Sequence, residues 1–253
     1  MKQEDALDKI VSSLKKDKLV KSLFLKGSMG RDEHDENSDI DLYCLIDDKD
    51  KSQFLEHRLG HLQAYRQLLF YDDIFIIAPQ IIAVYDNLLH IDLFTVTEET
   101  FLEKDYFKVL YDPDKRLDKY RETQNLTLSK EEFQDDVNDV AWFLFRYHKA
   151  VSRGNDIWAV VMLNHAMTHL ARVLLHRYKP NRAQLGLKII EDSLTKRLSV
   201  EVRKVFECLT PTNHTQSVQI IREIVSSEMD WIVTNLAVVE NTKPFLEKVI
   251  TFK

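Results

Sequence analysis

The spacing of apolar residues changes near the middle of the chain, and this change limits the folds that the chain can adopt. Up to about residue 115, short apolar runs of strand length alternate with polar turns, whereas from Glu131 onward apolar residues recur every three or four positions. A series of strands followed by a series of helices is typical of the α+β class. We therefore predict an N-terminal mixed-sheet domain over residues 1–120 and an all-helical bundle domain over residues 130–253.

The first half combines helix and strand patterns. Residues 5–17 place apolar side chains on one helical face, and the run from Phe54 to Leu69 also fits a helix. Pro79-Gln80 is expected to separate two strands, because proline cannot donate a hydrogen bond to a ladder. The predicted strands are residues 20–25, 40–46, 74–78, 81–85 and 88–96.

The second half reads as helices almost throughout. Apolar residues from Val137 to Val151 follow a helical period, and a second long helix runs from Ile157 to Tyr178 before Pro180 ends it. The polar stretch 112–130 is the expected connection between the two halves. Further helices are predicted over residues 183–192, 198–208 and 215–239.

The composition narrows the classes of partner. A hydrophobic share of 44% supports a buried core, and a formal net charge of −6 argues against a nucleic-acid partner, which requires a basic face. No run of about 18 apolar residues is present, so no membrane span is expected. Cys44 and Cys208 lack metal-ligand spacing and are expected to be unpaired thiols. Because the N-terminus is polar, unlike a signal peptide, we expect a cytoplasmic protein.

Three aspartates are the candidate metal ligands. Asp39 and Asp41 are two residues apart on a predicted strand, so both carboxylates lie on the same face of the strand. Two close like charges need a cation, and Mg²⁺ prefers carboxylate oxygens together with phosphates. Asp92 lies on another predicted strand, and if the strands are neighbours the three carboxylates converge and can hold two metal ions. Alternatively, Asp92 faces solvent at a sheet edge.

Gly27 and Ser28 follow the first predicted strand. A glycine here lets the backbone turn and approach a ligand, and the amides that follow can point at phosphate oxygens. Ser28 adds a hydroxyl and Arg31 adds a cation. The residues indicate a phosphate-binding turn.

The segment Leu25-Lys26-Gly27-Ser28-Met29-Gly30-Arg31, followed after a loop by Asp39-Ile40-Asp41-Leu42, resembles the signature of the DNA polymerase β-like nucleotidyltransferase superfamily. Within it, the chain is similar to the antibiotic adenylyltransferases that act on lincosamides, kanamycin and streptomycin, which join an N-terminal catalytic domain to a helical domain. The resemblance implies that Ser28 contacts the triphosphate and that Asp39, Asp41 and Asp92 bind magnesium.

The resemblance also extends to the first long helix of the second half. Lys149 matches a lysine that reaches the triphosphate from the helical domain in some relatives. The kanamycin enzyme has a glutamate base shortly before that lysine, whereas this chain has Phe145-Arg146. The general base is therefore left open between Asp92 and Asp139.

The resemblance implies a magnesium-dependent transfer of a nucleoside monophosphate, AMP from ATP, to a hydroxyl of a small acceptor, with release of pyrophosphate. The acceptor could be an aminoglycoside or a lincosamide, and some relatives build their sites across a homodimer. Two alternatives stay open: a nucleotide-binding regulator or toxin–antitoxin-type partner with little turnover, and an enzyme that modifies a protein or RNA.

A row of polar residues on the second long helix has three interpretations. His165, His169, Arg172 and His176 are spaced by four, three and four residues, which places them on one face. This face could line a substrate cleft or lie at the surface or an interface. The His165–His169 pair has zinc-ligand spacing, but no third ligand is evident.

Overall fold

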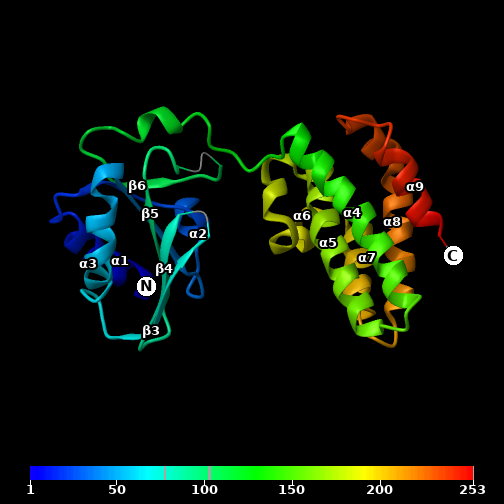
Figure 1. The fold of residues 1–253 in the computed structure, drawn as a ribbon, viewed down its shortest axis with the longest axis horizontal. Coiled ribbons are helices and arrows are strands. Elements are labelled where there is room, and N and C mark those ends of the chain that lie inside the picture. The colour runs from blue at the N-terminus through cyan, green and yellow to red at the C-terminus, as the bar shows by residue number, and fades with distance from the viewer. Residues whose placement is uncertain (77, 102–103, 253) are drawn as a thin grey trace. The chain divides into compact units, whose positions relative to one another are not determined.

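The computed structural model describes residues 1–76, 78–101 and 104–252. The chain divides into two compact units, Met1–Asn125 and Leu126–Lys253 (Figure 1). The first unit holds every strand among the described residues, and the second is helical. The predicted α+β fold, a mixed sheet followed by helices, is confirmed.

The first unit is built on one six-stranded sheet with the strand order β3-β4-β5-β2-β1-β6. β2 and β5 are parallel, and every other neighbouring pair is antiparallel, so the sheet is mixed. The strands are β1 (Val20–Leu25), β2 (Ile40–Ile46), β3 (Leu68–Phe75), β4 (Pro79–Tyr85), β5 (His90–Val96) and β6 (Lys108–Tyr111).

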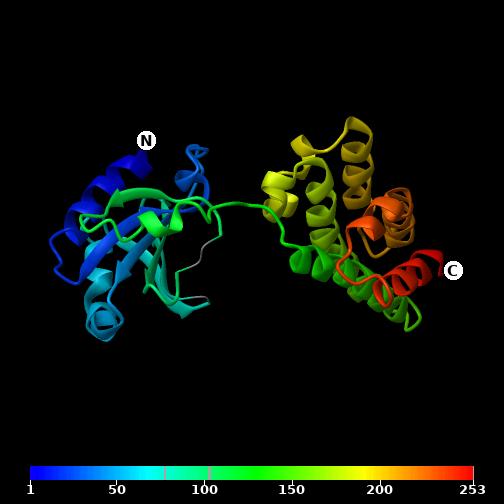
Figure 2. The same ribbon diagram turned by 90° about the horizontal axis from the view of Figure 1, so that it is seen from above.

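Two helices cover one face of this sheet. α1 (Lys2–Leu14) and α3 (Lys51–Leu62) lie against this face (Figures 1 and 2). They bury Ile10 and Phe54 in one core with alternate residues of β2 and β5, including Leu42 and Leu93. Since side chains alternate along a strand, the residues between these point to the opposite face. Asp41 and Asp92 therefore lie on the face that α1 and α3 leave open.

The opposite face carries a smaller aromatic core. Phe24, Tyr43 and Phe94 come from β1, β2 and β5, and their rings stack at centroid distances of 5.1 and 4.3 Å. Phe101, which follows β5, and Tyr120, which lies after β6, pack against this ladder as part of the same cluster. The remaining short elements of the unit are α2 (Gly27–Gly30), η1 (Asp48–Asp50) and η2 (Asp118–Tyr120).

The β3–β4 hairpin differs from the sequence prediction. The helix expected from Phe54 to Leu69 ends at Leu62, and β3 begins at Leu68, because an apolar run of this length suits either structure until a strand partner is known. The strand predicted at 74–78 is only the end of β3, although its residue 77 lies outside the described residues. Pro79 begins β4, the position in a strand that tolerates a missing donor.

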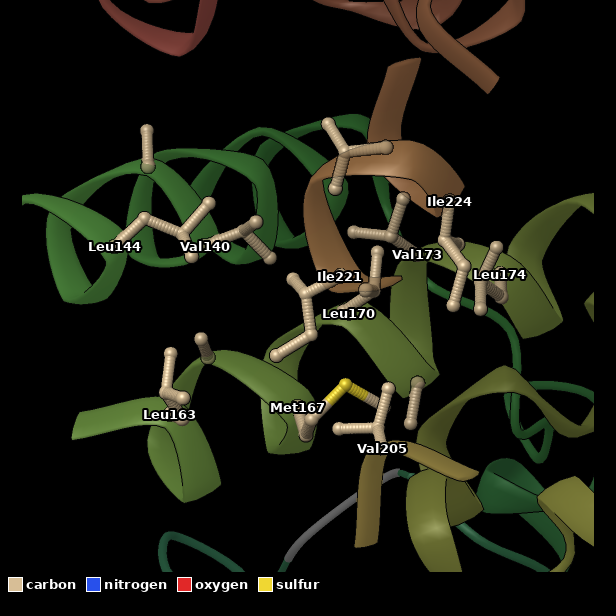
Figure 3. Packing of buried hydrophobic residues seen from close by; sticks show 14 of the residues in the cluster. Val140, Leu144, Leu163, Met167, Leu170, Val173, Leu174, Val205, Ile221 and Ile224 are labelled. Atoms are coloured by element: carbon tan, nitrogen blue, oxygen red, sulfur yellow. The ribbon is translucent and has the colours of Figure 1, made fainter. Parts of the chain in front are cut away.

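The second unit packs its helices around one apolar core. Its elements are α4 (Lys130–Val151), α5 (Asp156–Tyr178), η3 (Pro180–Lys188), α6 (Ile190–Ser193), α7 (Lys196–Glu207), α8 (His214–Asn235) and α9 (Thr242–Thr251). Figure 3 shows Leu170 and Met167 of α5 interleaved with Ile221 of α8 and Val205 of α7. Ser129 and Glu132 form a reciprocal capping box that fixes the start of α4.

α5 is long and apolar enough to span a membrane by length and composition alone, although the sequence contains no uninterrupted apolar run of that length. Half of its most apolar window is buried inside the unit, where residues such as Leu163 and Leu170 are fully covered. This burial matches the core helix of a bundle, whose apolar character serves packing between helices.

Candidate active site

Asp41 and Asp92 are direct neighbours across two parallel strands. The Cα atoms of Asp41 on β2 and Asp92 on β5 are paired in the ladder, as are those of Ile40 and Ile91 beside them. The strands that carry Asp41 and Asp92, whose order the sequence could not give, are therefore adjacent. Both carboxylates point to the same face of the sheet. Asp92 is not at a sheet edge, since β4 flanks β5 on its other side.

Asp39 completes the group from the residue before β2. Its Oδ2 lies 3.7 Å from His90 Nδ1, and His90 Nε2 lies 3.1 Å from Asp92 Oδ1, so the imidazole sits between the two carboxylates. Ligand atoms of Asp39, His90 and Asp92 all lie within 4.8 Å of one another. Asp92 is 13% exposed, whereas Asp39 is 47% exposed and faces the solvent side of the site.

The carboxylates of this group favour a positive charge between them, as the pKa of His90 shows. The hydrogen bond to Asp92 raises the pKa of His90 despite partial burial, and the charges of Asp39 and Asp41 add to this shift. Carboxylates directly opposite each other on adjacent strands repel. The carboxylates of Asp39 and Asp92, with that of Asp41 beside them on the same sheet face, offer oxygen donors of the kind that Mg²⁺ prefers, so the residues fit that ion chemically.

Gly27 brings the backbone close to these carboxylates. Its φ is +62°, and a Cβ built on it would lie 2.0 Å from Asp41 Oδ2, so any other residue would strain the backbone and displace the Asp41 carboxylate. The amide of Lys26 donates to the Asp41 carbonyl at 3.0 Å, which holds the turn against β2. Ser28 follows in the short helix α2, half-buried. The turn predicted from Gly27-Ser28 therefore lies beside Asp41.

Lys26 is a charged residue of this region that the sequence reasoning did not select. Its side chain is 5% exposed, its Nζ donates to the Lys104 carbonyl at 2.9 Å, and it lies over the rings of Tyr43 and Phe101. Burial lowers the pKa of Lys26 to about 8, although the charge of Asp105 opposes the shift. The sequence feature that could have identified Lys26 is its position directly before the Gly27 turn.

Arg31 is engaged with carboxylates of its own unit. Its Nη1 donates to both oxygens of Asp105, at 2.9 and 2.7 Å, and its Nε donates to Glu33 at 3.1 Å. The side chain is 13% exposed. These contacts hold the segment before β6 to the end of α2, and the predicted contact of Arg31 with a nucleotide stays a prediction.

The predicted residues of the second unit lie on α4 and α5. Lys149 is exposed on α4 with its Nζ over the ring of Phe145, and its contact with a triphosphate stays a prediction. Asp139, the alternative base, has Oδ2 3.6 Å from His169 Nε2. His169 Nδ1 lies 2.9 Å from Asp136 Oδ1, and Arg172 also pairs with Asp136.

The polar face of α5 is largely occupied by contacts inside its unit. His165 and His169 stack on the ring of Phe143 at 4.9 and 5.6 Å, and His176 packs against Phe133 and Trp231. Among the residues that the structure describes, the groups able to hold a metal do not include the His165–His169 pair. The rings on this face therefore contribute to packing.

Comparison with known protein families gives a match within the N-terminal unit. Residues 8–83 match the family described as Polymerase beta, Nucleotidyltransferase, a stretch that contains the Gly27 turn, Asp39 and Asp41. No curated protein gives a match.

Solved structures with some similarity include an aminoglycoside 6-adenyltransferase from Bacillus subtilis, at 13% identity and a TM-score of 0.37, with 98% of each chain covered. A nucleotidyltransferase-like protein from Exiguobacterium sibiricum matches at 15% identity and a TM-score of 0.40, covering 92% of this chain and 78% of the other. The CdnE cyclic dinucleotide synthase of Elizabethkingia meningoseptica, solved with GTP and Apcpp, matches at 12% identity and a TM-score of 0.29, covering 98% and 89%. The family match thus places a polymerase β nucleotidyltransferase domain within residues 8–83 of the N-terminal unit.

Proposed function

We propose that the chain transfers a nucleoside monophosphate, AMP from ATP, to a hydroxyl of a small acceptor in a magnesium-dependent reaction that releases pyrophosphate. The observation that carries the proposal is the pairing of Asp41 with Asp92 on adjacent parallel strands, beside a glycine turn that packs directly against the Asp41 carboxylate. Negative side chains next to an open backbone turn suit a triphosphate only when divalent cations accompany it.

Asp39, Asp41 and Asp92 would hold the magnesium, with two ions expected from the three carboxylates. When bound, these ions supply charge neutralisation for the phosphates and orientation for an in-line displacement. His90 lies between Asp39 and Asp92, so its imidazole would have to give way or join the ligands when a cation enters.

The chain's own residues have separate tasks in the proposal. The backbone at Gly27 admits the triphosphate close to β2, and the Ser28 hydroxyl donates a hydrogen bond to a phosphate oxygen. Asp92 accepts the proton of the acceptor hydroxyl, whose oxygen bonds to the α-phosphorus. The bond from that phosphorus to the bridging oxygen breaks, and pyrophosphate leaves with the electron pair. Asp139 is the alternative base.

An aminoglycoside or lincosamide antibiotic is the proposed acceptor, on the strength of the motif resemblance. The net charge of −6 suits a cationic acceptor such as an aminoglycoside. We place the enzyme in the cytoplasm, where ATP and magnesium are abundant. Arg31 and Lys149 are the proposed cationic contacts of the nucleotide, and a homodimer is an arrangement to be tested by solution mass.

The experiment is a screen of aminoglycosides and lincosamides with ATP or GTP, read by pyrophosphate release. Asp41→Asn should abolish release, whereas Asp8→Asn, an exposed carboxylate on α1, should leave it intact. Full activity in Asp41→Asn would overturn the mechanism. ATP labelled in the α-phosphate, incubated with cell extract, then identifies the acceptor class: label on a protein or RNA replaces the small acceptor, and nucleotide binding without transfer indicates a regulator.

A further inference from the structure

A second group of metal-ligand side chains lies between α1 and α3, on the helix-covered side of the sheet. Asp17 follows α1, and His57 and His61 are one turn apart on α3. His57 Nε2 lies 2.6 Å from Asp17 Oδ2, and His61 Nε2 lies 3.2 Å from the same oxygen. One ligand atom from each residue falls within 4.8 Å of the others. The three residues are called the Asp17 cluster below.

Each ligand of the Asp17 cluster is oriented by a second hydrogen bond. His57 Nδ1 lies 2.8 Å from the Gln53 carbonyl, and His61 Nδ1 lies 2.9 Å from Ser13 Oγ. Asp17 Oδ1 accepts from the amide of Leu19 at 2.9 Å, which directs Oδ2 toward the rings. Metal-binding histidines characteristically use their other nitrogen in this way, and the contact fixes which nitrogen faces the metal.

The spacing of the ligand atoms is close to what a tetrahedral ion needs. Zinc–nitrogen and zinc–oxygen bonds of about 2.0–2.1 Å place neighbouring ligand atoms about 3.3 Å apart. The His61–Asp17 contact of 3.2 Å already has this length, and the His57–Asp17 contact would open by about 0.7 Å. His57 is 45% exposed and can turn by that amount, whereas Asp17 and His61, at 10% and 13% exposed, form the fixed part.

We propose that the Asp17 cluster binds one divalent transition-metal ion of the zinc class, with water completing the coordination on the exposed side of His57. Two imidazole nitrogens and one carboxylate oxygen favour Zn²⁺, Co²⁺ or Ni²⁺ over Mg²⁺, which prefers oxygen ligands. The ion would link the end of α1 to α3, segments 40 residues apart in sequence at Asp17 and His57. Its role is to hold these two helices together over the sheet.

This metal site is separate from the magnesium site of the proposed function. The Asp17 cluster lies on α3 and just after α1, the two helices that pack on the face carrying Leu42 and Leu93, whereas Asp41 and Asp92 point to the other face. The inference therefore does not depend on the chain being an active transferase.

The test uses the purified full chain, stripped of metal, and titrates it with Co²⁺ while recording visible absorption. We expect one equivalent to give the intense bands of four-coordinate cobalt, and Zn²⁺ to displace it and raise the melting temperature by several degrees. His57→Gln should lose the bands and nearly all of the temperature rise. The matched control is His165→Gln, an exposed histidine of the other pair with the same helical spacing, which should keep both.

Two further results would overturn the proposal. Bands that persist in His57→Gln but vanish in Asp92→Asn would assign the ion to the carboxylates of the proposed active site. Absence of saturable Co²⁺ or Zn²⁺ binding by the native chain would mean that the Asp17 cluster only joins α1 to α3 through hydrogen bonds. Circular dichroism of His57→Gln separates loss of binding from loss of fold, and Asp17→Asn provides a second variant if His57→Gln unfolds.

Discussion

Asp41 and Asp92 face each other across the β2–β5 ladder, with their Cα atoms in register. Replacing Asp41 with Asn keeps the shape of the side chain and removes one charge of the proposed metal site. We expect pyrophosphate release to fall by at least about 100-fold, because replacing even a residue that only supports a metal ligand costs 10–100-fold. A steady-state assay at saturating ATP measures the loss, with Asp8→Asn as the charge-matched control.

Asp41→Asn should have the opposite effect on stability when magnesium is absent. The substitution removes repulsion with Asp92, so the free energy of unfolding should be unchanged or higher by up to about 1 kcal/mol. Urea denaturation in a chelator provides the measurement. A destabilised variant would mean that the Asp41 carboxylate contributes chiefly to the fold, and the activity loss could then not be assigned to the metal.

Removing magnesium should lower the stability of the native protein but not that of a variant without the metal ligands. An ion that binds the folded state and not the unfolded chain stabilises by about 2.7 kcal/mol at 100 times its dissociation constant. We expect magnesium plus a non-hydrolysable ATP analogue to raise the melting temperature of the native protein. The same additions should leave a double variant, Asp41→Asn with Asp92→Asn, unshifted.

Gly27→Ala should damage the site through its backbone. The added methyl would lie 2.0 Å from Asp41 Oδ2, and the positive φ adds strain of about 1–2 kcal/mol. We expect activity to fall as far as in Asp41→Asn, with a loss of stability. Gly154→Ala is the comparison, since Gly154 has a similar positive φ but open space around its Cα. Equal losses of activity in both variants would contradict a specific role for the Gly27 turn.

Lys26 should make stability depend on pH in the alkaline range. Because burial lowers its pKa from 10.5 to about 8, the unfolded chain binds more protons than the folded chain between these values, and the free energy of unfolding rises with pH there. Below pH 8 both states are charged and the burial cost is present in full. The free energy of unfolding of the native protein minus that of Lys26→Met should therefore rise by at most about 3 kcal/mol from pH 7.5 to 10.5. A flat difference would mean that Lys26 stays charged throughout.

Local patterns were sufficient to predict most of the elements. The strand bounds 20–25 and 40–46 followed from apolar runs that end at Gly27 and begin after Asp39, and they match β1 and β2. The long helices α4 and α5 followed from periodicity. Periodicity could not separate α3 from β3, because Leu68 and its neighbours form an apolar run whose pairing with β4 depends on distant residues.

The candidate site also has features that local sequence predicts and features that depend on tertiary structure. The spacing of Asp39 and Asp41 put both on one strand face, but only strand order could place Asp92 next to Asp41. β6 was missed because its four residues are flanked by polar sequence and gain their order by pairing with β1. The Asp17 cluster was missed because the histidines of α3 and an aspartate beyond α1 have no common motif, and packing of α1 against α3 brings them together.

The parallel pairing of β2 with β5 also sets when the site can exist during synthesis. Parallel strands cannot be joined by a tight turn, and α3, β3 and β4 must all be synthesised before β5 can align with β2. Contacts between such distant segments form late, because closing the intervening loop costs conformational entropy. A nascent chain that ends before His90 thus carries the glycine turn and two of the aspartates without a complete site. Capacity to bind magnesium with a triphosphate would report that β5 has paired with β2.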